Sequence, residues 1–476
     1  MSTVESADTG AGGRNKGSVL TLLKQAVAGT EQDYTEGPLN RAVFLLAVPM
    51  ILEMSMESVF GIVDVFFVGR LGPDAVASVG LTESFLTIIY SVAIGLSMAT
   101  TALVARRIGE KDPEDAARTA VQSIFVGVAA SLPVAVVGAV WARELLELMG
   151  APASVVDTGG GYTAWMLGGN ASILLLFLIN GVFRGAGDAS IAMRSLWLAN
   201  AINIVLDPCF IFGLGPFPEL GVTGAGIATT IGRSVGVAYQ LRALARSGRH
   251  LRVGRRHVVF DGAVAMRLLR LSVGGIGQFL IATASWIGLV RILTPFGAVA
   301  LAGYTIALRI IIVALLPAWG LSNAVATLVG QNLGAGKPDR AERSVWIAGV
   351  YNMVFLLGVM VVFLLGAEPF IAFFSADPEV RRMGALCLRV VSYGYAFYAW
   401  GMVLVQAFNG AGDTVTPSWI NFFCYWLFQI PIAWLLARTL GQGPIGVFVA
   451  ITLAESVIAV VGLVVFRRGS WKRKVV

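Results

Sequence analysis

Long apolar stretches, bounded by glycine, proline and charged residues, recur along almost the whole chain. A helix needs about 20 apolar residues to cross a bilayer, and each stretch reaches that length. The twelve stretches cover residues 43–68, 75–103, 119–142, 160–183, 190–213, 224–246, 268–291, 298–328, 343–366, 385–408, 416–437 and 446–466. The pattern therefore predicts an all-α integral membrane protein with twelve transmembrane helices.

The same pattern occurs twice, with a constant offset of 225 residues and no gap. Residues 104–118 (VARRIGEKDPEDAAR) match 329–343 (VGQNLGAGKPDRAER), and 183–188 (FRGAGD) match 408–413 (FNGAGD). Six segments per half is an even number, so the halves share one orientation about an axis along the membrane normal. We expect a polar arm at 1–40, an N-lobe at 41–246, a basic linker at 247–267, a C-lobe at 268–466 and a basic tail at 467–476.

Composition excludes a soluble multidomain protein. The 476 residues are 57% hydrophobic and 13% charged, whereas soluble domains are about 45–50% apolar and about 25% charged. Three isolated cysteines (Cys209, Cys387, Cys424) and two histidines (His250, His257) leave little material for disulfides, zinc, haem or Ser-His-Asp chemistry. We expect no enzyme activity and no cofactor.

The net charge of +7 is an orientation signal. If both termini are cytoplasmic, 26 of the 35 Lys and Arg residues fall at the inner face and six at the outer face, as the positive-inside rule requires. We therefore expect a multi-pass plasma-membrane protein with both termini in the cytoplasm and no nucleic-acid partner. The polar arm shows no cleavable signal, but residues 19–27 fit a short amphipathic helix.

Two duplicated bundles favour a secondary transporter over a channel, because such repeats place a substrate site at their interface near mid-membrane. The two GAGD sequences read as glycine-rich turns. Neither carries the lysine of a phosphate-binding loop, so transport driven directly by ATP is unsupported.

Ionisable side chains inside the predicted spans mark candidate functional positions, because each costs about 2.5–3.5 kcal/mol at a helix centre. The first half holds Glu53, Glu57, Asp64, Glu83 and Asp207, whereas the second half holds only Glu455. Each carboxylate could alternatively lie near an interface or pair with an arginine inside a span.

Helical periodicity arranges the polar residues of the first half in two stripes. The stripes comprise Glu53, Glu57 and Asp64 in the first segment, and Asn200, Asn203 and Asp207 in the fifth. They predict one internal polar cavity. Asp64 with Asp207 is a candidate proton acceptor, and the same groups with Asn203 and a hydroxyl of Thr229 or Thr230 are a candidate Na+ site. Both coupling ions stay open at this point.

Other positions have two interpretations each. Pro49 removes a backbone hydrogen bond inside the first segment, so it is either a hinge or an ordinary membrane-helix proline. Tyr395 and Tyr398, in an aromatic tenth segment, are either part of a cation site or packing and membrane-interface residues.

Together these residues resemble the multidrug and toxic compound extrusion (MATE) family. The resemblance rests on 49–72 (PMILEMSMESVFGIVDVFFVGRLG), the two turns FRGAGD and FNGAGD, 203–213 (NIVLDPCFIFG) and 221–229 (GVTGAGIAT), and it spans about residues 38–466. It implies twelve helices in two lobes and antiport of organic, often cationic, compounds against H+ or Na+.

The resemblance is greater to the archaeal and DinF-like branches. It implies that Asp64, Asn203 and Asp207 carry the coupling ion with Thr229, and that Pro49 bends the first helix. Another branch has carboxylates in helices 7 and 10, where this chain offers Gln278 and aromatic residues instead. The resemblance does not explain Glu53, Glu57 and Glu83, which we keep with Asn200 as additional cavity candidates.

We therefore expect an antiporter that exports amphipathic compounds, acts as a monomer and has small molecules and membrane lipid as partners. A flippase of lipid-linked saccharides is the alternative, since Arg291, Arg309 and Arg389 lie inside or beside spans of the second half and suit a diphosphate. An integral-membrane prenyl-lipid transferase is disfavoured because the chain has no DDxxD motif.

Overall fold

The computed structural model describes residues 19–29, 32–246 and 251–474, which are helical and contain no strand. In the polar arm, α1 (Val19–Ala28) confirms the predicted amphipathic helix. The N-terminal half continues with α2 (Leu39–Val68), α3 (Pro73–Gly109), α4 (Pro113–Val140), α5 (Ala142–Leu148), α6 (Ala153–Gly168), α7 (Asn170–Ala186), α8 (Ala189–Phe212) and α9 (Val222–Arg246).

The C-terminal half repeats this order with more irregular helices. It comprises α10 (Gly262–Leu293), α11 (Ala298–Gly334), α12 (Pro338–Ala372), α13 (Pro378–Ser392), α14 (Tyr395–Gly410), α15 (Val415–Asn421), α16 (Ile430–Trp434) and α17 (Pro444–Arg467). Two segments are π-helical. The first, η4 (Phe422–Gln429), joins α15 to α16, and the second, η5 (Leu435–Thr439), follows α16. A 3-10 turn, η6 (Ser470–Arg473), follows in the tail.

The predicted membrane spans correspond to these helices. In the described chain, ten helical segments are long and apolar enough to cross a membrane, and α13 with α14, bent by 59°, forms an eleventh. The remaining predicted span, the sixth (224–246), is α9, whose 25 residues give about 37 Å at 1.5 Å per residue, although its composition is more polar. The chain is thus an all-helical, multi-pass membrane protein.

Three boundaries differ from the sequence-based expectation. The fourth predicted span is two helices, because Gly169 leaves helical geometry between α6 and α7. The tenth span is likewise divided between α13 and α14. The linker expected at 247–267 is shorter, because the Asp261 side chain accepts hydrogen bonds from the amides of Ala263 and Val264 and so starts α10 at Gly262.

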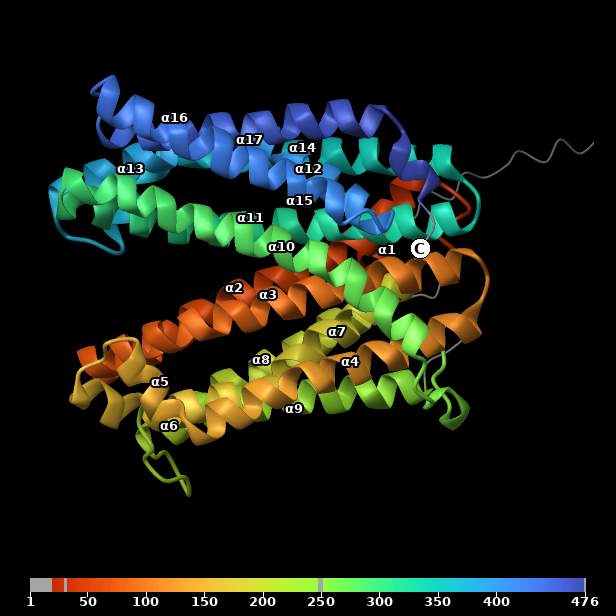
Figure 1. Cartoon of the computed structure of the whole chain (residues 1–476), viewed down its shortest axis with the longest axis horizontal. Helices are drawn as coiled ribbons and strands as arrows, with labels where there is room; N and C mark the ends of the chain where they lie inside the picture. The colour runs from red at the N-terminus through yellow and green to blue at the C-terminus, as the bar shows by residue number, and fades with distance from the viewer. Residues whose placement is uncertain (1–18, 30–31, 247–250, 475–476) are drawn as a thin grey trace, which may run out of the picture.

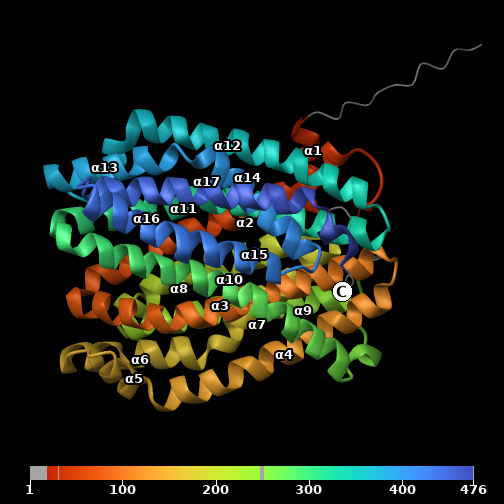
Figure 2. The ribbon, with the colours of Figure 1, turned by 45° about the horizontal axis from the view of Figure 1, so that its top comes forward.

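The two halves form two helix bundles that lie side by side, with their long helices roughly parallel (Figure 1). The N-lobe (α2–α9) and the C-lobe (α10–α17) meet mainly where α2 packs on α11 and α3 packs on α10. A view turned by 45° shows the same two bundles and places α1 and the C-terminus at one end of the molecule (Figure 2). We call this the terminus end.

Glycines let the lobes approach closely at the terminus end. A Cβ atom at Gly109 of α3 would overlap the carbonyl of Gln331 on α11, and one at Gly334 would overlap the carbonyl of Arg106. Hydrogen bonds reinforce this contact: the Thr327 hydroxyl donates to the Arg184 carbonyl at 2.9 Å. The lobes are therefore joined at the terminus end by backbone-to-backbone packing.

Candidate functional site

The centre of the candidate site is a hydrogen-bonded group between α8 and α9. The Asn203 amide donates to the Asp207 carboxylate at 3.2 Å and to the Thr229 hydroxyl at 2.9 Å. All three residues are buried. Asp207 Oδ2 and Asn203 Oδ1 have no hydrogen-bond partner within the described residues. Two buried oxygens are thus available for a proton or a cation.

Asp64 lies beside this group on the facing helix. It stands on the last turn but one of α2, is half-buried, and interacts electrostatically with Asp207 of α8 and Glu83 of α3. Asp64 of α2 is therefore within electrostatic range of a carboxylate on each of two other helices. Glu83 is exposed and faces the guanidinium of Arg309 on α11 of the C-lobe.

Arg233 supplies the positive charge of this group. It is buried on α9, one helical turn after Thr229. Its guanidinium lies 5.9 Å from the ring centroid of Phe60 and 5.7 Å from that of Tyr90, and it interacts with Asp64. Its Nη1 atom has no hydrogen-bond partner among the described residues. Arg233 is thus an internal cation beside the carboxylates.

Glu57 joins the same network from α2. It accepts a hydrogen bond of 3.2 Å from the Asn200 amide on α8 and interacts electrostatically with Arg233. Asn200 is buried, whereas Glu57 is half-buried. The two residues extend the polar group from Asp64 toward the terminus end.

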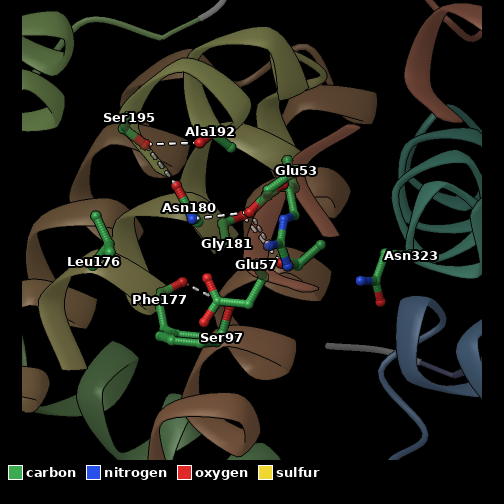
Figure 3. Close-up of polar contacts among 12 residues, drawn as sticks. Glu53, Glu57, Ser97, Leu176, Phe177, Asn180, Gly181, Ala192, Ser195 and Asn323 are labelled. Carbon is green, nitrogen blue, oxygen red and sulfur yellow. Dashed lines mark hydrogen bonds and ion pairs between the residues drawn. The ribbon is translucent and has the colours of Figure 1, made fainter. Parts of the chain in front are cut away.

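Glu53 belongs to a second network, which adjoins Glu57 (Figure 3). It is fully buried and forms an ion pair with Arg184 of α7. It also accepts a hydrogen bond of 3.0 Å from Asn180. Gln240 of α9 and Ser195 of α8 complete the network by donating to the Asn180 carbonyl oxygen. Figure 3 shows Glu53, Asn180 and Ser195 in the N-lobe, with Asn323 apart on the C-lobe side.

The C-lobe repeats the Glu53 network in neutral form. The 225-residue offset pairs Glu53 with Gln278 and Arg184 with Asn409. Gln278 and Asn409 exchange two hydrogen bonds, of 3.0 and 3.2 Å. One lobe therefore uses an ion pair where the other uses two amides. Gln278 accordingly lies in this amide pair, at a position equivalent to Glu53.

The remaining candidates are Pro49, Tyr395 and Tyr398. Pro49 is buried inside α2, which continues through it as one helix from Leu39 to Val68. Tyr395 is fully buried in the C-lobe core, where its ring centroid lies 6.1 Å from that of Phe363 and 6.5 Å from that of Tyr398. Tyr398 is half-buried. Of the two, Tyr395 faces the core of its lobe.

We call Asp64, Asn203, Asp207 and Thr229 the N-lobe group. Their side-chain oxygens suit H+ or a hard monovalent cation. Carboxylate, amide and hydroxyl oxygens are the ligands that such cations take, and Asp64, Asp207, Asn203 and Thr229 provide them. The described residues contain no group of three or more His, Cys, Asp or Glu side chains arranged for a metal ion. A cation here would thus need amide and hydroxyl oxygens in addition to the acids.

Loops at the terminus end tie the two lobes together. Asp33, before α2, pairs with Lys111 of the N-lobe, while Lys337 of the C-lobe donates to the Thr35 carbonyl at 3.0 Å. Burial opposes ionisation of Asp33, but hydrogen bonds from Lys111 and Thr35 outweigh it and hold the pKa of Asp33 at about 2. The short segment 33–37 is therefore an ionised clamp between the lobes.

Two arginines had no role in the sequence-based interpretation. Arg184 lies in the sequence FRGAGD, which was predicted to be a turn, and Arg233 lies in the sixth predicted span (224–246). Spacing carried a signal for both, because Arg184 follows Asn180 and Arg233 follows Thr229 by four residues, which places each pair on one helix face.

Known proteins resemble the chain over nearly its full length. A family model described as MatE matches residues 49–209 and 276–435, once in each lobe. A protein described as a probable multidrug resistance protein NorM, from Thermotoga maritima, is 25% identical over 92% of this chain and 94% of its own length. A FAD transporter of Shewanella oneidensis is 25% identical over 83% of this chain and 88% of its own length.

Solved structures of membrane transporters have the same fold as this chain. A crystal structure of MATE in complex with MaL6 superposes with a TM-score of 0.87 at 25% identity, covering 93% of this chain and 99% of that one. An outward-facing multidrug resistance MATE transporter of the MOP superfamily gives 0.86 at 26% identity, with 93% and 98% covered. Fold, duplicated match and full-length similarity together show that the chain belongs to the MatE family of membrane transporters.

Proposed function

We propose that this protein exports amphipathic, often cationic, organic compounds across the plasma membrane in exchange for H+ or Na+. The observation that carries the proposal is the pair of unpartnered, buried oxygens on Asp207 and Asn203, beside the carboxylate of Asp64. Buried polar atoms are normally satisfied, so this group is suited to an occupant that binds and leaves.

The exchange of an organic cation for a coupling ion follows from the charge of Asp64 and Asp207. With Asp64 and Asp207 unoccupied, the N-lobe presents negative charge that attracts a cationic compound. A proton or Na+ bound there neutralises that charge and lowers the affinity for the compound, which then leaves. Pro49, which removes one backbone hydrogen bond from α2, allows this helix to bend as the ion binds.

The joined terminus end supports the direction of transport. If both termini are cytoplasmic, as the Lys and Arg distribution favours, the lobes meet on the inner side and the Asp64 group lies toward the outer ends of α2 and α8. This is the arrangement needed to release a compound outside and take up the coupling ion. One chain contains both lobes, so a monomer suffices.

The test is flux in liposomes containing the purified protein. A fluorescent organic cation is followed under a proton gradient and, separately, under a sodium gradient. We expect one gradient to drive uptake, and Asp64→Asn and Asp207→Asn each to abolish it. Glu144→Gln, on the exposed helix α5, is the control and keeps wild-type flux. Unchanged flux in both Asp variants would refute the assignment.

A transporter of compounds that carry a diphosphate is the second candidate. One relative is a FAD transporter, and Arg309 is exposed opposite Glu83. Arg389, by contrast, is 3.4 Å from Glu368, so this cation is already paired. Uptake of FAD into the same liposomes distinguishes the two candidates, and FAD flux without flux of the organic cation would favour the second one.

A further inference from the structure

Glu455 is a buried carboxyl group of the C-lobe that the proposed exchange does not use. Glu455 lies in the middle of α17 with 8% of its surface exposed. Its Oε1 atom accepts a hydrogen bond of 3.0 Å from the Tyr425 hydroxyl. Tyr425 belongs to the π-helical segment η4. Eight consecutive π-helical residues are rare, and such turns recur at functional sites.

Glu455 forms no ion pair with any of the residues that the structure describes. The groups that interact with it electrostatically are Tyr398 of α14 and Tyr425 and Cys424 of η4. The charged residues on the other elements packed against α17 are Arg267, Arg270 and Arg291 on α10, Glu379, Arg381, Arg382 and Arg389 on α13, and Arg438 on η5. None of them forms an ion pair with Glu455 in the part of the chain that the structure describes; Arg389 pairs with Glu368 and Arg382 with Glu379.

The internal repeat places Glu455 next to Ala454, the C-lobe equivalent of Thr229. The 225-residue offset pairs Glu455 with Thr230, next to Thr229, and Tyr425 with Asn200. Thus the helix pair that carries the Asn203–Thr229 hydrogen bond in one lobe carries the Tyr425–Glu455 hydrogen bond in the other. The residues equivalent to the N-lobe group itself are apolar in the C-lobe: Leu289, Phe428, Ile432 and Ala454.

The chemistry of this pair is that of a proton site. An ionised carboxylate buried without a cation is far more costly than a neutral carboxylic acid. A neutral Glu455 can accept the Tyr425 hydroxyl on its carbonyl oxygen, which is the contact observed. One carboxyl and one hydroxyl are too few oxygens for Na+, which needs several ligands.

We propose that Glu455, positioned by Tyr425, is a proton-binding site of the transporter, on the C-lobe helix pair that corresponds to α8 and α9 of the N-lobe. A proton leaves Glu455 for water and returns to it as the lobes move. Tyr425, which is bonded to Glu455, and Tyr398, which interacts with it electrostatically, are both half-buried. The two lobes then differ in chemistry: an acid–amide group in one and an acid–phenol pair in the other.

Infrared difference spectroscopy tests this directly on the full chain in detergent. Spectra recorded at alkaline pH are subtracted from spectra at acidic pH, which isolates carbonyl bands of carboxyl groups that gain a proton. We expect Glu455→Gln to lose one such band and Asp207→Asn to lose a different one. The measurement uses neither substrate nor gradient, so its result does not depend on what the protein exports.

Tyr425→Phe is the second variant. It keeps the carboxyl group but removes the hydrogen bond to its carbonyl oxygen, so the Glu455 band should move to higher frequency without disappearing. Thermal unfolding of both variants, compared with wild type, shows that each is folded. If Glu455→Gln leaves every pH-dependent carboxyl band in place, Glu455 keeps one protonation state throughout. Its contact with Tyr425 is then purely structural, and the proposal is overturned.

Discussion

Glu53 and Arg184 form a buried ion pair whose equivalent in the other lobe is Gln278 with Asn409. Removing one member of such a pair leaves an uncompensated charge, whereas replacing both by well-fitting neutral groups costs little. The repeat thus supplies a natural neutral replacement at the same place in the fold.

We expect Glu53→Gln to destabilise the protein by about 3–5 kcal/mol, because Arg184 is left buried without its carboxylate. The double variant Glu53→Gln with Arg184→Asn copies the C-lobe amides and should recover most of the loss. Thermal unfolding in detergent measures both. A double variant that is no more stable than the single one would contradict the equivalence of the two positions.

Arg233 is the second residue whose role depends on its neighbours. Its guanidinium lies among Asp64, Glu57 and two aromatic rings, where it competes with any other cation for the same carboxylates. Arg233→Gln should therefore raise the affinity for a monovalent organic cation by about tenfold, or ~1.4 kcal/mol.

Fluorescence titration of the purified protein with a fluorescent cation measures this affinity. Ser234→Ala, the next residue on α9 and an exposed one, is the matched control and should bind as wild type does. Weaker binding in Arg233→Gln would mean that the arginine holds the site together and does not compete for it.

At the scale of helices, α3 and α11 touch through glycines at the terminus end. Because Cβ atoms at Gly109 and Gly334 would meet backbone carbonyls of the other lobe, a methyl group there cannot be accommodated by rotating a side chain. Overlap of this kind costs about 1–3 kcal/mol. This end of the molecule therefore depends on the absence of two side chains.

Gly334→Ala should separate the lobes at the terminus end and shift the protein toward conformations open there. Spin labels on Glu110→Cys and Asp339→Cys, both exposed, report the distance by double electron–electron resonance. The control is Gly277→Ala on α10, where an added Cβ atom meets nothing within 4 Å. Identical distance distributions for Gly334→Ala and the control would show that the contact does not hold the closed end.

The contribution of segment 33–37 to the stability of the protein depends on pH through the ionisation of Asp33. The pKa of Asp33 is about 2 in the folded protein against an ordinary value of 3.8. Its contribution to stability is therefore complete above the ordinary value and is lost as the pH falls toward 2. It is small, since the pair is partly exposed.

We expect Asp33→Asn to lower the unfolding temperature by the same small amount at every pH from 5 to 8. Differential scanning fluorimetry across that range tests the expectation. A difference that disappears between pH 5 and 8 would show that Asp33 is not ionised as its hydrogen bonds require.

For the whole molecule, the lobes meet at the end that carries α1 and the C-terminal tail (Figure 1). The distribution of Lys and Arg predicts that this end faces the cytoplasm. The opposite end carries the loop between α8 and α9, which includes the exposed residue Glu219.

Cysteine labelling on intact cells tests this orientation. In a background where Cys209, Cys387 and Cys424 are replaced, Glu219→Cys should react with a membrane-impermeant maleimide added outside. Asp339→Cys should react only after the membrane is permeabilised. The reverse pattern would invert the predicted topology and, with it, the proposed direction of transport.

The sequence alone determined the helical membrane fold and the two lobes, and it singled out Asp64, Asn203 and Asp207. These features are local: apolar length predicts a span, a constant offset reveals a duplication, and helical spacing aligns Asp64, Asn203 and Asp207 on faces that can meet. The family match in both lobes agrees with that interpretation.

Only the tertiary structure decided which charges neutralise one another. Glu53 and Arg184 are 131 residues apart, and Glu455 meets Tyr425 from a different helix, so no pattern along the chain distinguishes a paired carboxyl group from a free one. The helix breaks at Gly169 and between α13 and α14 also depend on packing against neighbouring helices. Burial and pairing are properties of neighbours in space, and the chain acquires those neighbours only when the lobes assemble.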